Sequence, residues 1–428
     1  MEQTSLRGIA NKAVQDKTYR FRNLFGVLTL GFLFWCWEFI NKKASAGVDR
    51  IDARMYEENL IGNIEQLVEQ VKGKTYRTKL VLRKHIPKLG GKLRPLGIPA
   101  IADKLLQLAV AKILETIYEQ DFLDCSYGYR PNTGAHKAVK DLTQALMSGR
   151  YHYLVEADIK GFFNNIDHDL LIEMLGKRID DKAFLNLIRK WLKAGILDKG
   201  LVICPITGTP QGGVVSPILA NIYLHTVLDV WFYETVQTHC RGQVYLCRYA
   251  DDFVCAFEYE KDAQRFYEAL GKRLNKFNLE VAENKTQLLV FSRCKIRNGS
   301  SFNILGFEFR WGLNRRIKNR LRIPIIKRRT SREKLYASLA NFKVWLKKSS
   351  RLPKNILFAM LNRKLYGYYN YYGIIGNYKS LGSFVYRVTQ ALFNWLNRRS
   401  QRKSYNWEGF KELVKHFGIA KPRICHAF

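Results

Sequence analysis

Tyr245-Leu-Cys-Arg-Tyr-Ala-Asp-Asp-Phe-Val-Cys-Ala-Phe257 is the stretch from which the fold of this chain can be inferred. Two apolar runs, residues 244–247 and 253–257, flank a short polar centre, and their aromatic and β-branched side chains predict a β-hairpin. The tip carries Asp251 and Asp252. Adjacent carboxylates at a tight turn repel each other, and a divalent cation such as Mg²⁺, which prefers oxygen ligands, offsets that repulsion. For an isolated pair, a solvated Asp-Asp turn would be the simpler interpretation.

A second acidic position lies upstream, at the end of another expected strand. Residues 151–157 are rich in β-forming side chains, Asp158 follows them, and Gly161 marks the next turn. An Asp at a strand end can meet the Asp pair of a neighbouring hairpin across one sheet. Three carboxylates placed in this way form a platform for two-metal phosphoryl transfer, in which one ion activates the attacking hydroxyl and the other stabilises the leaving oxygen.

The composition limits the class of protein. A chain of 428 residues that is 47% hydrophobic can bury two or three cores. Its net charge of +34 favours a polyanionic partner, with nucleic acid first and an anionic membrane second. Residues 292–428 contain 31 Lys and Arg but only four Asp and Glu, which suits a part that grips a duplex through its phosphates.

No membrane or disulfide framework is expected. The apolar stretch 24–37 is too short to span a bilayer and lacks a signal-peptide cleavage site, so we predict a buried helix there. Eight cysteines are scattered without a CxxC pair or a His cluster, which argues against a zinc site and fits a reducing compartment. A cytosolic location is therefore expected.

Two further segments carry candidate ligand contacts. Residues 80–99 predict a hairpin with a turn at 89–91, and its cations could clamp a triphosphate or merely protect an exposed edge strand: Arg83, Lys84, Lys88, Lys92 and Arg94. Residues 208–216 form a glycine-rich loop in which Gln211 can offer an amide to a base or primer. Ser216 and Pro217 then predict a helix start, with Ser as the N-cap.

The remaining core segments follow from their periodicity. Helices are expected over residues 102–120, 169–194, 218–229 and 262–277. A strand is expected over residues 302–309, because apolar positions alternate there. If residues 158–163 are extended, Phe162 and Phe163 point to opposite faces.

These motifs resemble those of a known family. Tyr249-Ala-Asp-Asp252 resembles the metal-binding motif of reverse transcriptases, and Gly208-Thr-Pro-Gln-Gly-Gly-Val-Val-Ser-Pro217 resembles their substrate-binding loop. The likeness is greatest to bacterial group II intron reverse transcriptase–maturases, and it extends over about residues 4–424. It implies an α+β right-hand polymerase: an N-terminal extension and fingers in 1–149, a palm with an antiparallel sheet in 150–311, and a helical thumb and maturase region in 312–428.

The resemblance also implies an activity. The 3′-hydroxyl of a DNA primer would attack the α-phosphate of a dNTP on an RNA template. Two Mg²⁺ ions, with Mn²⁺ as a substitute, would be held by Asp158, Asp251, Asp252 and the backbone carbonyl of Ile159. Intron RNA and a DNA target would be further partners. The location that the resemblance implies is the bacterial cytoplasm, in association with the nucleoid or a ribonucleoprotein.

Several side chains match nucleotide contacts of the family. Lys88 and Arg94 match residues that hold the incoming triphosphate, and Phe163 matches the steric gate against a ribose 2′-hydroxyl. Asn164 departs from relatives, which often have Asp after the Phe pair. Lys285 matches a lysine near the nucleotide, where it could act as an acid toward pyrophosphate or simply pair with Glu283.

Contacts with RNA are expected at two places. Arg130 would contact the template, with a structural turn as an equal alternative. A cluster in the tail is expected to face RNA: Arg398, Arg399, Arg402 and Lys403. The aromatics of 365–373 and 395–407 either stack on bases or build a core, and we favour the core.

Two other functions remain open. One is an RNA-binding splicing factor without catalysis, against which the three carboxylates argue. The other is a reverse transcriptase in antiviral defence or CRISPR spacer acquisition, whose polymerase core would look the same. No HNH endonuclease motif follows the maturase-like region.

Overall fold

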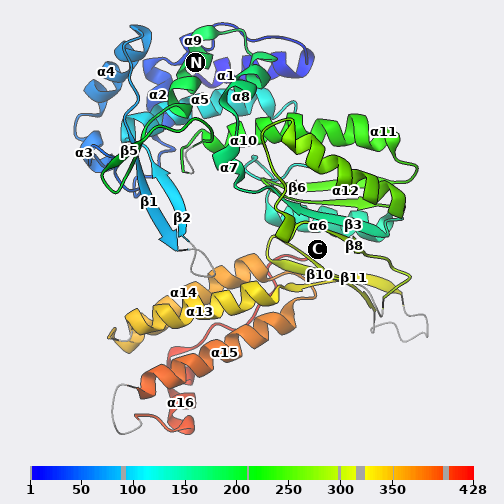
Figure 1. Cartoon of the computed structure of the whole chain (residues 1–428). Coiled ribbons are helices and arrows are strands. Elements are labelled where there is room, and N and C mark those ends of the chain that lie inside the picture. Colours follow the sequence, from blue (N-terminus) through cyan, green and yellow to red (C-terminus); the bar gives the residue numbers. More distant parts are fainter. Residues whose placement is uncertain are drawn as a thin grey trace. The chain divides into compact units, whose positions relative to one another are not determined.

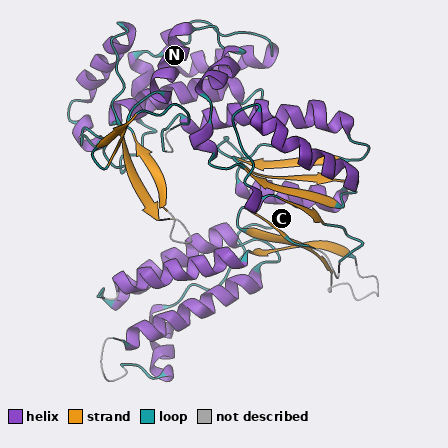
Figure 2. Cartoon of the chain, in the orientation of Figure 1, coloured by secondary structure: helices purple, strands orange, loops and turns teal. Residues whose placement is uncertain are grey.

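The computed structural model describes residues 2–87, 93–209, 212–296, 300–314, 323–349, 351–398 and 404–428. It contains two compact units, one formed by Met1–Gly134 and Val155–Leu288 and the other by Ala135–Leu154 and Leu289–Phe428. Helices and strands occur in both units, so the predicted α+β class is confirmed (Figures 1 and 2). Among the described residues no helix is long and apolar enough to cross a membrane.

The first unit begins with helices that surround α5. Its helices here are α1 (Glu2–Gln15), α2 (Leu30–Trp37), α3 (Ala53–Glu57), α4 (Leu60–Lys72) and α5 (Ile101–Tyr118). Both α1 and α2 contact α5, most of whose apolar side chains are buried, as expected for a core helix. The helix predicted over 24–37 starts only at Leu30, because the Thr29 side chain caps it by accepting a hydrogen bond from Phe32 N.

The two strands of the predicted basic hairpin are confirmed, whereas its predicted turn at 89–91 lies outside the described residues. Strands β1 (Val81–Pro87) and β2 (Leu93–Ile98) are antiparallel, with Leu82 opposite Ile98. They belong to a sheet of order β2-β1-β4-β5, which β4 (Ile196–Asp198) and β5 (Leu201–Ile203) complete.

A second sheet carries the acidic motifs. Its order is β6-β7-β3-β8, formed by β3 (Tyr153–Asp158), β6 (Val244–Tyr249), β7 (Asp252–Phe257) and β8 (Gln287–Val290). The boundary between the two units runs through β3 and β8. The accompanying helices are α7 (Phe162–Asn165), α8 (His168–Gly176), α9 (Lys182–Leu192), α10 (Ser216–Leu224), α11 (Gln237–His239) and α12 (Glu260–Asn275).

The helix predicted over 169–194 was wrong in one respect, because it is two helices, α8 and α9. Asp181 starts α9 by accepting a hydrogen bond from Phe184 N. Within the break, Arg178 is buried and donates to Asp121 and to main-chain oxygens near the N-terminus. Capping and this buried ion pair therefore stop a periodicity that would otherwise continue. The predicted helix 218–229 likewise ends its regular α-form at Leu224, where the π-helical turn His225–Asp229 follows.

The second unit combines a small sheet with long helices. Helix α6 (Ala135–Ser148) accompanies the sheet β11-β10-β9, formed by β9 (Phe302–Ile304), β10 (Phe307–Leu313) and β11 (Pro324–Thr330). The helices α13 (Arg332–Ser349), α14 (Lys354–Tyr372), α15 (Tyr378–Asn397) and α16 (Trp407–Phe417) follow. The single strand predicted over 302–309 is a hairpin instead, because Leu305 and Gly306 both adopt positive φ and reverse the chain.

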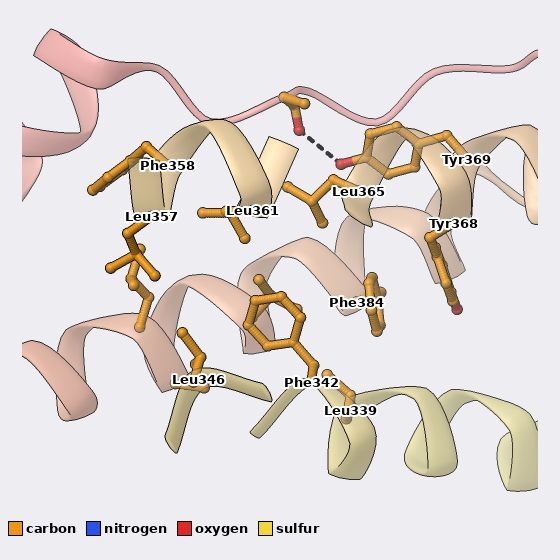
Figure 3. Packing of buried hydrophobic residues seen from close by; sticks show 14 of the residues in the cluster. Leu339, Phe342, Leu346, Leu357, Phe358, Leu361, Leu365, Tyr368, Tyr369 and Phe384 are labelled. Carbon is orange, nitrogen blue, oxygen red and sulfur yellow. Dashed lines mark hydrogen bonds between the residues drawn. The ribbon is translucent and has the colours of Figure 1, made fainter. Parts of the chain in front are cut away.

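Aromatic and aliphatic side chains from these helices form one core (Figure 3). Tyr368 stacks on Phe384 with 3.8 Å between ring centroids, and the hydroxyl of Tyr369 donates to Ala420 O at 2.7 Å. Tyr366, by contrast, is exposed. The expectation that most aromatics of 365–373 build a core is therefore supported at Tyr368 and Tyr369.

Candidate active site

The acidic hairpin has the predicted geometry. Tyr249 pairs with Asp252 as the last register position of β6 and β7, so Ala250 and Asp251 form the turn. Ala250 adopts a φ of 55°, which a tight turn of this kind requires. Strand β3, which ends at Asp158, lies directly beside β7. The sheet order thus brings the two acidic motifs to neighbouring strands, as the sequence predicted; metal binding itself stays a prediction.

The charges of this site influence one another. Burial raises the pKa of Asp251, and the negative charge of Asp158 raises it further, whereas Arg94 and Lys285 act in the opposite direction. The hydrogen bond to Asp158 raises the pKa of Lys285, and the carboxylates of Asp251 and Asp252 contribute to the same shift. All five side chains, which the sequence assigned to metal or nucleotide, therefore belong to one electrostatic site.

Lys285 pairs with Asp158, not with the neighbouring Glu283 that the sequence suggested. Its ammonium contacts Asp158 Oδ2, and its side chain is 57% exposed. In the described part of the chain, no three Asp, Glu, His or Cys side chains lie close enough together to hold a metal ion in these conformations. The donor set nevertheless suits a hard cation: its ligands are carboxylate oxygens, and Asp251 is unfavourable as a buried anion without a counter-charge.

The main chain at Ile159 is compatible with the predicted ligand role. Ile159 forms an isolated antiparallel bridge with Val281, and the two hydrogen bonds of that bridge, 2.8 and 2.9 Å long, join the residues on either side of the pair. In a pair of this type the N–H and C=O groups of the central residues point away from each other. The Ile159 carbonyl therefore faces away from Val281.

A buried polar network supports the hairpin turn, and sequence analysis missed it. Arg248 is fully buried and donates from Nε and Nη2 to the two carboxylate oxygens of Asp229, at 2.6 and 2.5 Å. It also donates to Asn221 Oδ1, Ser126 Oγ and Ala250 O, at 3.2, 2.7 and 3.2 Å. The bond to Ala250 O fixes the carbonyl of the turn residue that has the positive φ. A single Arg inside the otherwise apolar run before the acidic pair was the available signal.

The loop before α6 packs against the same turn. A Cβ at Gly128 would lie 2.6 Å from Ala250 N, so only glycine permits this approach. Arg130 follows, only 8% exposed at its side chain, and forks onto Glu119 at 2.7 and 3.0 Å. Its remaining bonds go to the carbonyls of Leu123 and Ser126. These contacts occupy Arg130 without a nucleic acid, so the structure favours the turn over the expected template contact.

The Phe pair lies in a short helix, so the reasoning from an extended strand was wrong. Gly161 has a φ of 56° and starts α7 immediately after β3. Phe162 is 1% exposed and Phe163 is half-buried, so the two rings still differ in exposure. Phe163 O accepts a hydrogen bond from Thr209 N at 2.7 Å, which ties this helix to the glycine-rich segment.

The glycine-rich segment lies between α7 and β2. A Cβ at Gly208, where φ is 89°, would lie 2.7 Å from Asn164 O. A Cβ at Gly212, where φ is 112°, would lie 2.4 Å from Gly97 O on β2. These positions therefore need glycine for close backbone packing. Helix α10 starts at Ser216 itself, with Val215 in the cap position, one residue earlier than predicted.

Several predicted contacts lie outside the described residues: Lys88, Gln211, Arg399, Arg402 and Lys403. Arg94 is described and exposed on β2. Arg398 is exposed too, and its guanidinium lies 5.0 Å from the centre of the Trp395 ring.

Comparison with known proteins shows where the chain has relatives. Residues 86–309 match the family described as "Reverse transcriptase (RNA-dependent DNA polymerase)". The group II intron-encoded protein LtrA of Lactococcus lactis subsp. cremoris is 31% identical over 395 aligned residues, which cover 76% of this chain and 65% of LtrA. Protein YkfC of Escherichia coli K12 is 35% identical over 236 residues, or 49% of this chain and 62% of YkfC. The chain thus spans less than two thirds of the length of these relatives.

Proposed function

The chain belongs to the reverse transcriptase family, and on that premise we propose that it extends a DNA primer on an RNA template. One observation carries the proposal. Asp158, Asp251 and Asp252 come from neighbouring strands and share one electrostatic site with Arg94 and Lys285. An acidic centre with cations beside it suits a metal-assisted reaction on a triphosphate.

Acidic and basic residues of the site would have different roles. The carboxylates of Asp158 and Asp251, with Asp252, would hold two Mg²⁺ ions, which neutralise phosphate charge and lower the pKa of the primer hydroxyl. Arg94 would hold the triphosphate together with Lys88. Lys285, whose ammonium contacts Asp158 in the structure, would contact the pyrophosphate in the form of the site in which Asp158 holds Mg²⁺.

The glycine-rich segment and α7 would place the nucleotide. Gly208 and Gly212 allow the backbone to approach closely, and Gln211 would contact the base or the primer. Phe163, the more exposed ring of the pair, would lie under the sugar and exclude a 2′-hydroxyl by steric clash.

The cellular role would be that of a group II intron maturase, which binds intron RNA for splicing and mobility. The similarity to LtrA and the basic composition of residues 292–428 support this role. In this proposal the fingers, palm and thumb occupy 1–149, 150–311 and 312–428, and the tail cluster around Arg398 contacts RNA. A defence-associated reverse transcriptase would be distinguished by the genes beside it, since an intron-encoded protein lies among intron RNA domains.

Primer extension on an RNA template tests the proposal. Asp158→Asn and Asp251→Asn should each abolish extension and leave RNA binding intact, because each loses a metal ligand and keeps its shape. Asp169→Asn is the matched control, since it removes a carboxylate with an 85% exposed side chain. Near-normal extension by either active-site variant, or equal loss in the control, would contradict the assignment.

A further inference from the structure

The second unit contains a large pocket that the catalytic proposal does not use. Its volume is about 1420 Å³. Sites for drug-sized ligands measure roughly 300–1,000 Å³, so this pocket is large enough for several units of an extended polymer. All of its lining residues belong to the second unit, on α6, β10, β11, α13, α15 and the segments next to them.

Basic side chains surround the pocket. Five different elements contribute them: Lys140, Arg310, Lys327, Arg329, Arg332 and Lys379. Arg329 is already paired with Glu308, at 2.6 Å. No Asp or Glu is among the described residues that line the pocket. Like charges gathered around one concavity attract a polyanion and repel one another without it.

One further cation is buried at this pocket. Arg328 is 8% exposed, and burial lowers the pKa of its guanidinium. Its hydrogen bonds reach the hydroxyl of Thr143 and the main-chain oxygens of Ile375 and Phe428, at 3.3, 3.5 and 2.8 Å. Its Nε has no hydrogen-bond partner among the described residues. A buried donor without a partner costs free energy that an anionic acceptor would recover.

The pocket follows the free edge of a sheet. Six consecutive residues, 325–330, line it. Side chains of a strand alternate between faces, so a pocket on one face alone would contact only alternate residues. Within the described residues β11 has β10 as its only neighbour in the sheet, which leaves its outer edge toward the pocket.

Apolar and hydroxyl groups complete the lining. Ile325, Met147 and Tyr336, which is 55% exposed, offer surfaces on which bases can lie. Ser380 and Ser383 can exchange hydrogen bonds with a ribose 2′-hydroxyl. Cations for phosphates next to apolar and aromatic surfaces for unpaired bases are the features of single-strand recognition.

We propose that this pocket binds an unpaired RNA strand, with its phosphates on the basic rim and its bases on the apolar lining. The site is built by the second unit alone, and binding there needs neither nucleotide nor metal. If RNA binding in the pocket is disproved, the proposal of polymerase activity is therefore unaffected. If polymerase activity is disproved, the proposal for the pocket is unaffected as well.

The test compares two triple variants of the full chain. Lys140→Ala/Arg332→Ala/Lys379→Ala removes three exposed cations of the pocket. The control Lys411→Ala/Lys415→Ala/Lys421→Ala removes three exposed cations of the same unit that do not line the pocket. The probe is a fluorescent single-stranded RNA of about 12 nucleotides, within the range of single-strand sites, titrated in EDTA without dNTP at several salt concentrations.

The pocket variant should bind more weakly, and the log–log slope of affinity against salt should fall by about 2, since each lost phosphate contact removes roughly 0.7. The control should keep the wild-type slope. Equal slopes in both variants, whether reduced or unchanged, would overturn the proposal. Polyglutamate as a competitor tests whether the pocket binds an acidic protein instead. If the pocket variant loses polyglutamate binding but keeps RNA binding, the site belongs to an acidic protein.

Discussion

Replacing Arg248 by methionine should destabilise the first unit by about 3–5 kcal/mol at neutral pH, the usual cost of breaking a buried ion pair. The structure explains the size of the effect. Asp229 is 0% exposed and would keep a charge without its partner. Ser126 Oγ, Asn221 Oδ1 and Ala250 O would each lose a donor as well, at roughly 1 kcal/mol or more apiece.

The loss should depend on pH, and its sign follows from Asp229. Burial alone would raise the pKa of this carboxyl, but Arg248 and His225 hold it below its ordinary value. In the wild-type protein the carboxylate therefore stabilises the fold above its unfolded pKa of about 3.9, and this contribution is lost as the pH falls through the lower folded value. Without Arg248 burial dominates and raises the pKa, so the destabilisation is present at neutral pH and relieved by protonation in acid. The difference between the two proteins should shrink as the pH is lowered.

Urea unfolding followed by circular dichroism, at about pH 7.5 and about pH 5.5, measures both quantities. Arg178→Met is the matched control, because Arg178 is itself buried and pairs with the half-buried Asp121 at 2.9 Å, away from the acidic turn. Both variants should lose stability. Only Arg248→Met should also impair the use of metal in primer extension, so that extension needs a higher metal concentration. Arg248→Lys keeps the charge and serves if the methionine variant does not fold. A loss below about 1 kcal/mol, or a difference that does not change with pH, would refute the reasoning.

Three further predictions concern the candidate active site. Lys285→Met should tighten Mn²⁺ binding a few-fold, because it removes a partly exposed ammonium that competes for Asp158 with an interaction of up to about 1 kcal/mol. Unchanged or weaker Mn²⁺ binding in a metal titration would count against that competition. Phe163→Val should admit ribonucleotides on an RNA template, whereas Phe162→Val should lower stability without changing sugar selection; the reverse result would place the gate at the other ring. Because the pKa of Asp251 is raised, its negative charge lowers stability above that pKa, and this cost falls as acid protonates the carboxylate. Asp251→Asn, measured in EDTA, should therefore raise the melting temperature at neutral pH and raise it less in acid. A lower melting temperature at neutral pH would contradict this.

Local pattern was enough to locate the acidic motifs. Runs of aromatic and β-branched residues around Asp251 and before Asp158 predicted the hairpin and the neighbouring strand, and both are present. The alternation of apolar residues misled at 302–309, because the chain reverses there, and burial alternates in β9 but not at the start of β10. Leu305 adopts a positive φ there, which its side chain disfavours, so nothing in its identity announced the turn.

Pairing between distant residues could not be predicted. Sequence proximity suggested Glu283 as the partner of Lys285, but the fold presents Asp158, which lies 127 positions away. Arg130 could have faced RNA or a turn, and only the position of Glu119 decided for the turn. In each case the choice depended on which oxygen the folded chain brought within reach.

By itself, the sequence determined the class of this protein: the charge, the order of the motifs and the three carboxylates all follow from residue identity and short-range periodicity. The tertiary structure decided how those residues are held. The fork of Arg248 onto Asp229, the approach of Gly128 to Ala250 and the basic pocket along β11 join segments far apart in the chain. Such contacts depend on burial and on distances set by the whole fold, which no local pattern encodes.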